Sequence, residues 1–107
     1  MTNRKEKVAE LIREKAAEFL SRENNQTSLI TVTSANASPD LKKATIFITV
    51  FPESKEKTAL LFAKRKRGEI REMLKKYMTT KTVPFVDIQI DLGEKNRQRI
   101  DELSRIK

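Results

Sequence analysis

The stretch from Lys64 to Lys76 restricts what this chain can fold into more than any other part of the sequence. Its thirteen residues include seven Lys or Arg and two Glu, so it holds five of the eight net positive charges of the 107-residue chain. The residues on both sides of Gly68 follow a helical pattern, yet Gly in a helix interior costs about 1 kcal/mol relative to Ala. A bend or a close backbone approach at Gly68 is therefore favoured over one straight helix. Because concentrated positive charge attracts polyanions, the stretch predicts two short helices that meet at a bend and contact nucleic acid.

Apolar spacing divides the rest of the chain into helices and strands. The predicted elements are, in order, a helix over Arg4–Glu23, strands over Leu29–Ala37 and Lys43–Phe51, the two middle helices, a third strand opened by Pro84, a turn at Leu92 and Gly93, and a short helix over residues 94–106. The first two strands can form a hairpin, and the helix pair then leads to a third strand that can pair in parallel. Helices cover one sheet face in this arrangement, which predicts an α+β fold of one domain over residues 1–107.

The composition excludes several classes of function. The chain has no Cys and no His, which removes disulfides, thiolate metal sites, the commonest general base and the commonest zinc ligand. The sequence also lacks a Gly-rich nucleotide loop, so we expect a protein that is not an enzyme and that uses no cofactor, metal or small-molecule substrate. No apolar run approaches the roughly 18 residues of a membrane span, and no signal sequence opens the chain. We therefore expect a cytoplasmic protein without membrane contact.

Two pairs of side chains on the strands need separate interpretation. Phe47 and Phe51 lie on one side of the second strand, where they either pack under a loop or the last helix, which we favour, or form a stacking platform for bases. Asp87 and Asp91 share one face of the third strand about 13 Å apart. That distance is too long for a catalytic carboxylate pair, so we expect both to be solvated.

The order of elements resembles a KH domain of the bacterial (type II) topology, which clamps RNA backbone with a Gly-x-x-Gly loop between two helices. This chain has a single Gly at that place, and a KH-like fold in which a helix-kink-helix replaces the loop resembles the ribosome-binding factor A family. Local patterns that agree with that family are Leu29-Ile30-Thr31-Val32-Thr33 followed by Ser38-Pro39-Asp40-Leu41, Gly68-x-Ile70-Arg71 at the kink, Val83-Pro84 before the third strand, and Arg99-Ile100 with Leu103 near the end. The chain departs from the family at Lys66, where Ala is usual, and at Phe85, where Glu is usual.

The resemblance implies a ribosome assembly factor that binds the 30S small subunit through 16S ribosomal RNA during its maturation and rRNA processing. The residues themselves imply a phosphate cradle, because helix N-termini favour anions, Arg engages phosphate bidentately and Lys adds a point charge. We therefore predict a monomer that contacts RNA through Lys64, Arg65, Lys66, Arg67, Gly68, Arg71 and Lys75.

These site assignments have structural alternatives. The basic residues around the bend can form a solvated charge run. Gly68 can allow close packing of a helix on the sheet, and Arg71 can pair with Glu69 or Glu72 on its own helix.

Two other functions also remain open. One is a general single-stranded RNA binder that uses the same surface, which would not distinguish ribosomal RNA from random RNA. The other is a protein-interaction module that docks through Phe47 and Phe51, and its binding would depend little on salt.

Overall fold

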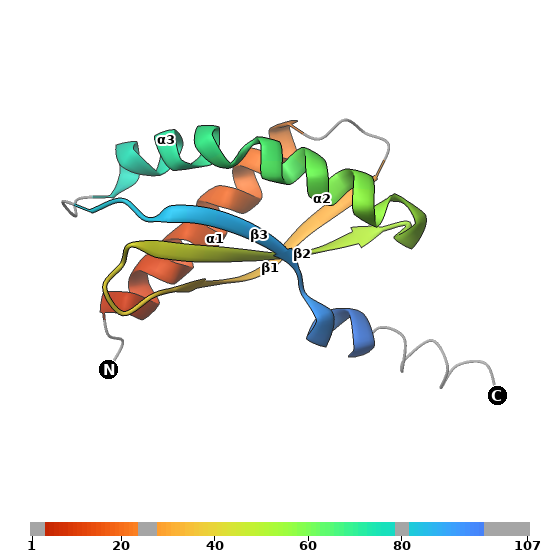
Figure 1. Ribbon diagram of the computed structural model, residues 1–107, viewed down its shortest axis with the longest axis horizontal. Coiled ribbons are helices and arrows are strands. Elements are labelled where there is room, and N and C mark those ends of the chain that lie inside the picture. The colour runs from red at the N-terminus through yellow and green to blue at the C-terminus, as the bar shows by residue number, and fades with distance from the viewer. Residues whose placement is uncertain (1–3, 24–27, 79–81, 98–107) are drawn as a thin grey trace.

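The computed structural model describes residues 4–23, 28–78 and 82–97 (Figure 1). Its elements, in chain order, are α1 (Arg4–Glu23), β1 (Leu29–Ala37), β2 (Lys43–Phe51), the 3₁₀ turn η1 (Glu53–Lys55), α2 (Glu56–Arg65), α3 (Arg67–Tyr77) and β3 (Phe85–Ile90). Residues 92–97 are also helical. The predicted α+β class, the order of the elements and the bounds of α1, β1 and β2 are confirmed.

The three strands form one sheet in the order β1-β2-β3. β1 and β2 pair antiparallel as a hairpin, and β2 and β3 pair in parallel through the α2–α3 crossover, as predicted. The register of β1 shifts between Val32 and Ser34, which leaves Thr33 as an extra residue in a bulge. This arrangement has the strand order and directions expected for the type II KH topology.

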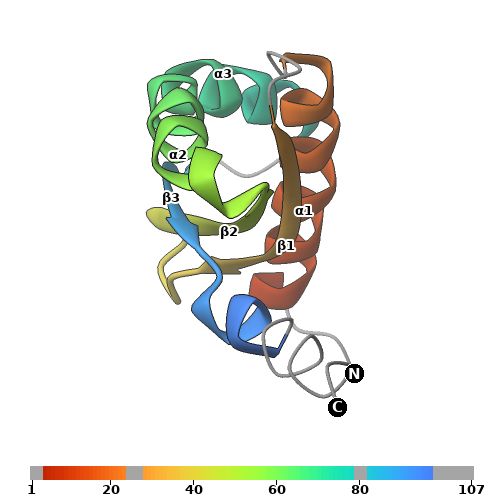
Figure 2. The same cartoon turned by 90° about the vertical axis from the view of Figure 1, so that its right-hand side faces the viewer.

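The core lies between the sheet and the helices α1, α2 and α3, which pack on the same sheet face (Figures 1 and 2). Its largest fully buried side chains come from α1, α3 and the sheet, and include Ile12, Leu20, Ile46, Ile48, Ile70, Leu74 and Ile88. Burying a side chain of this size contributes about 1.5–3 kcal/mol relative to leaving it in water. The core therefore fixes which faces of α3 and β3 are left for a ligand.

The other sheet face carries the alternate residues of each strand. Phe47 is half-buried there, and Gln89, its register partner, is exposed. Phe51 is 72% exposed, so our expectation that it packs under a loop or the last helix is wrong. Phe51 sits at the end of β2, opposite Leu29, which is also exposed.

The last helix begins earlier than predicted because Asp91 caps it. The Glu94 N–H donates to Asp91 Oδ1 at 3.0 Å, and the Lys95 N–H donates to the Asp91 carbonyl at 3.0 Å. Leu92 and Gly93 thus belong to the helix, and the turn predicted there is wrong. The remainder of the predicted helix, residues 98–106, lies outside the described residues, as do Arg99, Ile100 and Leu103.

Asp91 is also tied to the sheet. The Thr33 hydroxyl donates to Asp91 Oδ2 at 2.6 Å, so the bulge in β1 supplies a partner for the capping carboxylate. The Thr33 hydrogen bond, followed by the Glu94 N–H, holds the pKa of Asp91 below its usual value. The prediction that Asp91 is merely solvated is therefore wrong.

Candidate nucleic-acid interface

The helix break lies at Lys66, two residues before Gly68. Lys66 has φ −90° and ψ 1°, outside the helical range, and it is the only residue between α2 and α3. Its N–H donates to the Ala63 carbonyl at 3.0 Å, and its carbonyl accepts from the Ile70 N–H at 2.9 Å. The two helices are therefore a bent pair, as predicted, but the bend is not centred on the glycine.

Gly68 is exposed in the first turn of α3, and its backbone does not need a glycine. It does not have a positive φ, and a Cβ built on it would meet nothing within 4 Å. The alternative of close helix–sheet packing at Gly68 is therefore wrong. Because Gly68 has no side chain, the helix backbone is uncovered at this position, which lies four residues after Lys64 and three residues before Arg71.

Lys64 and Arg67 converge on Asp87 of β3. Lys64 Nζ lies 4.0 Å from Asp87 Oδ1, and Arg67 Nη1 donates to the same oxygen at 3.3 Å. Arg67 Nε also donates to the Lys64 carbonyl at 2.9 Å, which caps the end of α2. Asp87 is therefore an anchor for two cations, and the prediction that it is simply solvated is wrong.

The carboxylate of Asp87 stays ionised in this setting. Burial favours its neutral form, but the backbone N–H of Ile88 and the charge of Lys64 outweigh that effect, and the pKa of Asp87 is lowered. Its side chain is still 42% exposed, so these ion pairs are at the surface and exchangeable. A phosphate can therefore compete with Asp87 for Lys64 and Arg67.

Arg71 follows Arg67 by one helical turn and reaches the start of β3. Its guanidinium carbon lies 4.2 Å from the centroid of the Phe85 ring, and Nη2 donates to the Val83 carbonyl at 3.2 Å. Neither Glu69 nor Glu72 accepts a hydrogen bond from it in the described structure, so the alternative of a local Arg71 ion pair is not realised. Arg71 is held at the sheet edge beside an exposed aromatic ring.

The other predicted cations do not join Lys64, Arg67 and Arg71 beside β3. Lys66 pairs with Glu69 at 3.2 Å and lies 5.7 Å from the centroid of the Phe62 ring. Lys75 pairs with Glu72 at 2.8 Å. Arg65 is exposed and forms no ion pair with the described part of the chain. The structure thus gathers Lys64, Arg67 and Arg71 along β3 but does not bring all the predicted residues together.

The surface keeps an excess of positive charge despite these pairs. Residues 64–76 contain seven Lys and Arg, whereas three carboxylates in the described structure pair with them, those of Glu69, Glu72 and Asp87. The helix dipole adds less than we expected, because the negative end of α2 lies one residue from the positive end of α3. Attraction for an anion therefore comes mainly from the side chains.

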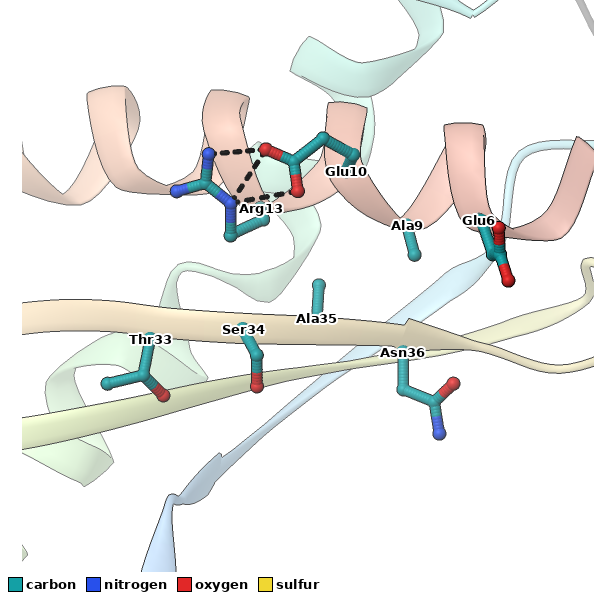
Figure 3. Close-up of a pocket in the computed structure, with 8 residues that line it drawn as sticks. All are labelled: Glu6, Ala9, Glu10, Arg13, Thr33, Ser34, Ala35 and Asn36. Carbon is teal, nitrogen blue, oxygen red and sulfur yellow. Dashed lines mark hydrogen bonds and ion pairs between the residues drawn. The ribbon is translucent and has the colours of Figure 1, made fainter. Parts of the chain in front are cut away.

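A separate recess of about 540 Å³ lies between α1 and β1 (Figure 3), lined by Glu6, Ala9, Glu10, Arg13, Thr33, Ser34, Ala35 and Asn36. Arg13 Nε donates to Glu10 at 3.0 Å, and this bond raises the pKa of the guanidinium and lowers that of the carboxyl. Two glutamates and one paired arginine do not make an anion site. The nucleic-acid candidate is therefore the α2–α3–β3 side.

Among the described residues, no group of three or more acidic side chains is arranged to hold a metal ion. Among the helices of residues 4–23, 28–78 and 82–97, none has the length and apolar character needed to cross a membrane.

The sequence analysis missed the roles of Asp87 and Asp91, and it identified Phe85 only as a departure from the family pattern. The alternation of β3 already placed Phe85 and Asp87 on the polar side of the strand, next to each other on one face. The alternation could not show which side chain pairs with Asp87, because its partner Arg67 is twenty residues away in the sequence.

Comparison with known proteins supports a common origin over almost the whole chain. A family model described as "Ribosome-binding factor A" matches residues 4–104. The Coxiella burnetii protein named ribosome-binding factor A is 30% identical over 105 residues, which are 96% of this chain and 88% of the relative.

Solved structures share the fold at lower identity. The crystal structure of ribosome-binding factor A from Thermus thermophilus matches with a TM-score of 0.72 and 18% identity, over 82% of this chain and 97% of the other. A second match is a homology model of the Thermus thermophilus factor fitted into a cryo-EM map of its complex with the 30S subunit. Its TM-score is 0.65 at 18% identity, over 76% of this chain and 88% of that one.

Proposed function

Because the chain belongs to the ribosome-binding factor A family, we propose that it is a ribosome assembly factor that binds the 30S subunit through 16S ribosomal RNA during maturation. It acts in the cytoplasm as a monomeric single domain, residues 1–107, and not as an enzyme. The relative whose coordinates were fitted into a 30S complex supports the choice of partner.

One observation carries the proposal: Lys64, Arg67 and Arg71 line β3 beside the uncovered backbone of Gly68. Arg67 offers a fork of N–H donors that fits two phosphate oxygens, and Lys64 adds a compact charge. Such contacts fix the position of an RNA backbone without reading its sequence. Specificity for the subunit then comes from the shape of the ribosomal RNA.

The remaining predicted cations extend this surface. Arg65 is exposed, Lys75 pairs with Glu72 on α3 at the surface, and Lys66, at the helix break, pairs with the exposed Glu69. Exposed pairs of this kind contribute about 0–1 kcal/mol, so RNA phosphate can replace either glutamate at little cost. We therefore keep Lys64, Arg65, Lys66, Arg67, Gly68, Arg71 and Lys75 as the proposed RNA-contact residues.

The test is charge reversal at the bend. Changing Lys64, Arg65, Lys66 and Arg67 together to Glu should release the protein from small-subunit precursors at physiological salt, measured by co-sedimentation. A matched control reverses four exposed cations elsewhere, Lys7, Arg22, Lys55 and Lys57, with the same change in net charge. If the bend carries binding, the control variant stays bound.

Salt titration adds a quantitative measure. Removing one phosphate contact should make the slope of log K against log salt shallower by about 0.7 for single-stranded RNA. Unchanged co-sedimentation and an unchanged slope in the bend variant would contradict the proposal. Competition between 16S fragments and random RNA separates a 30S factor from a general single-stranded RNA binder.

A further inference from the structure

Phe85 is an aromatic side chain that the core does not use. It begins β3 and is 67% exposed, whereas its strand neighbours Val86 and Ile88 are buried. Its backbone is fixed, because the Phe85 N–H donates to the Lys42 carbonyl at 2.9 Å and its register partner in β2 is Lys43. A large apolar ring at a polar sheet edge gains little from burial, so folding alone does not explain it.

The ring is held from one side by Arg71. The guanidinium lies 4.2 Å from the ring centroid, and its bond to the Val83 carbonyl fixes it in place. Arg71 Nε is buried and has no hydrogen-bond partner among the described residues, so this side chain gives up hydration to stay in that position. A cation against a ring contributes about 0.5–1 kcal/mol at an exposed site. The ring is therefore oriented in advance of any ligand.

The ring also stands next to the proposed phosphate contacts. Asp87, which holds Lys64 and Arg67, is two residues further along the same face of β3, about 7 Å away. Lys43 is the register partner of Phe85 in the neighbouring strand β2, so a second cationic residue lies next to Phe85 in the sheet. A flat apolar surface between cations fits a nucleotide, which has a flat base and a charged backbone.

We infer that Phe85 is a stacking platform for an unpaired base of the bound RNA, with Arg71 supporting the ring from behind and Lys64 and Arg67 holding the adjacent phosphate. This rests on the function proposed above. Stacking of a base on an aromatic side chain is tolerant of sequence and suits single-stranded loops and bulges, where bases are free to turn outward. The chain thus takes an exposed nucleotide and not a duplex at this end of β3.

The experiment uses a short unstructured RNA that carries 2-aminopurine, whose fluorescence is quenched by stacking. Phe85→Ala should weaken binding by about 5- to 150-fold and abolish the quenching caused by the wild-type protein. Phe85→Tyr should retain both properties. Phe85→Leu keeps apolar cover over Arg71 but lacks a ring, so it should lose the quenching as Ala does.

Phe51→Ala is the matched control, because Phe51 is 72% exposed but sits at the opposite end of β2, beside Leu29. It should bind and quench like the wild type. Equal losses in the Phe51 and Phe85 variants, or quenching that survives Phe85→Leu, would overturn the inference. Thermal melts check folding: Phe51→Ala should leave Tm nearly unchanged, and Phe85→Ala should lower it by no more than the roughly 2–6 °C that corresponds to losing the Arg71 contact.

The two proposals fail in different ways. If the four-residue charge reversal abolishes RNA binding while Phe85→Ala binds like the wild type, the platform is wrong and the phosphate surface stands. If wild-type protein binds neither the RNA nor small-subunit precursors, the proposed function is wrong. If Phe85→Ala loses the precursor but keeps the RNA, the ring contacts a protein and the inference is overturned.

Discussion

Gly68→Ala should make this protein more stable and a weaker RNA binder. Gly in a helix costs about 1 kcal/mol relative to Ala, and the new Cβ meets nothing within 4 Å. The position is close to the start of α3, so we expect the free energy of unfolding to rise by about 0.5–1 kcal/mol. For a domain of this size the gain corresponds to an increase in Tm of roughly 2–6 °C.

RNA affinity should change in the opposite direction. The methyl group would cover the bare backbone beside Lys64 and Arg71, where we propose that a phosphate approaches. Losing one hydrogen bond to a charged group is worth about 1.5–3 kcal/mol, so affinity should fall about tenfold or more. Calorimetry measures the stability, and a filter or fluorescence titration at fixed salt measures the RNA dissociation constant.

Gly93→Ala is the control for this pair of measurements, because Gly93 lies in the last helix and not beside the bend. It should leave RNA affinity unchanged. A Gly68→Ala variant that is less stable than the wild type would refute the reasoning about open space. A variant that is more stable and binds RNA equally well would refute the close approach of a phosphate to this backbone.

Three further predictions concern single side chains. Asp87→Asn should raise RNA affinity about 2- to 5-fold, since each exposed pair that it frees at Lys64 and Arg67 is worth under about 1 kcal/mol; a fall in affinity in the same titration would mean that Asp87 instead presents these cations to RNA. Asp91→Ala should cost about 1 kcal/mol at pH 7. The lowered pKa of Asp91 makes its contribution complete above the ordinary Asp range and lost as pH falls through the folded value, so the difference between denaturant melts of variant and wild type should be full at pH 7 and shrink as pH falls below the ordinary Asp range. Leu74→Ala, at a fully buried position, should cost about 2–5 kcal/mol in the same melts, and a loss under 1 kcal/mol would contradict the described core.

The sequence was most informative where local pattern and burial agree. The alternation of Val86, Ile88 and Ile90 predicted which face of β3 is covered, and the apolar spacing of α1 predicted its whole length. These patterns arise because strand and helix periods decide which residues can reach one core. The fold class followed from the order of such segments.

Details that depend on distant partners could not be predicted. The break falls at Lys66 because α2 ends where Arg67 caps the Lys64 carbonyl and turns towards Asp87, a contact that exists only once β3 lies beside α3. Asp91 likewise caps a helix while accepting from Thr33, 58 residues away. In the sequence alone these two carboxylates cannot be told apart from ordinary surface charges. In the structure, Asp87 pairs with Lys64 and Arg67 at the α2–α3 bend, and Asp91 caps the last helix.

The bulge at Thr33 has a consequence for how copies of this protein meet. β1 is an edge of the sheet, and in the described chain it pairs only with β2, so its other side presents backbone donors and acceptors along nine residues. A straight, flat edge of that length would accept a strand from another molecule and begin an intermolecular sheet. The extra residue twists the edge and interrupts its repeat, which works against such self-association.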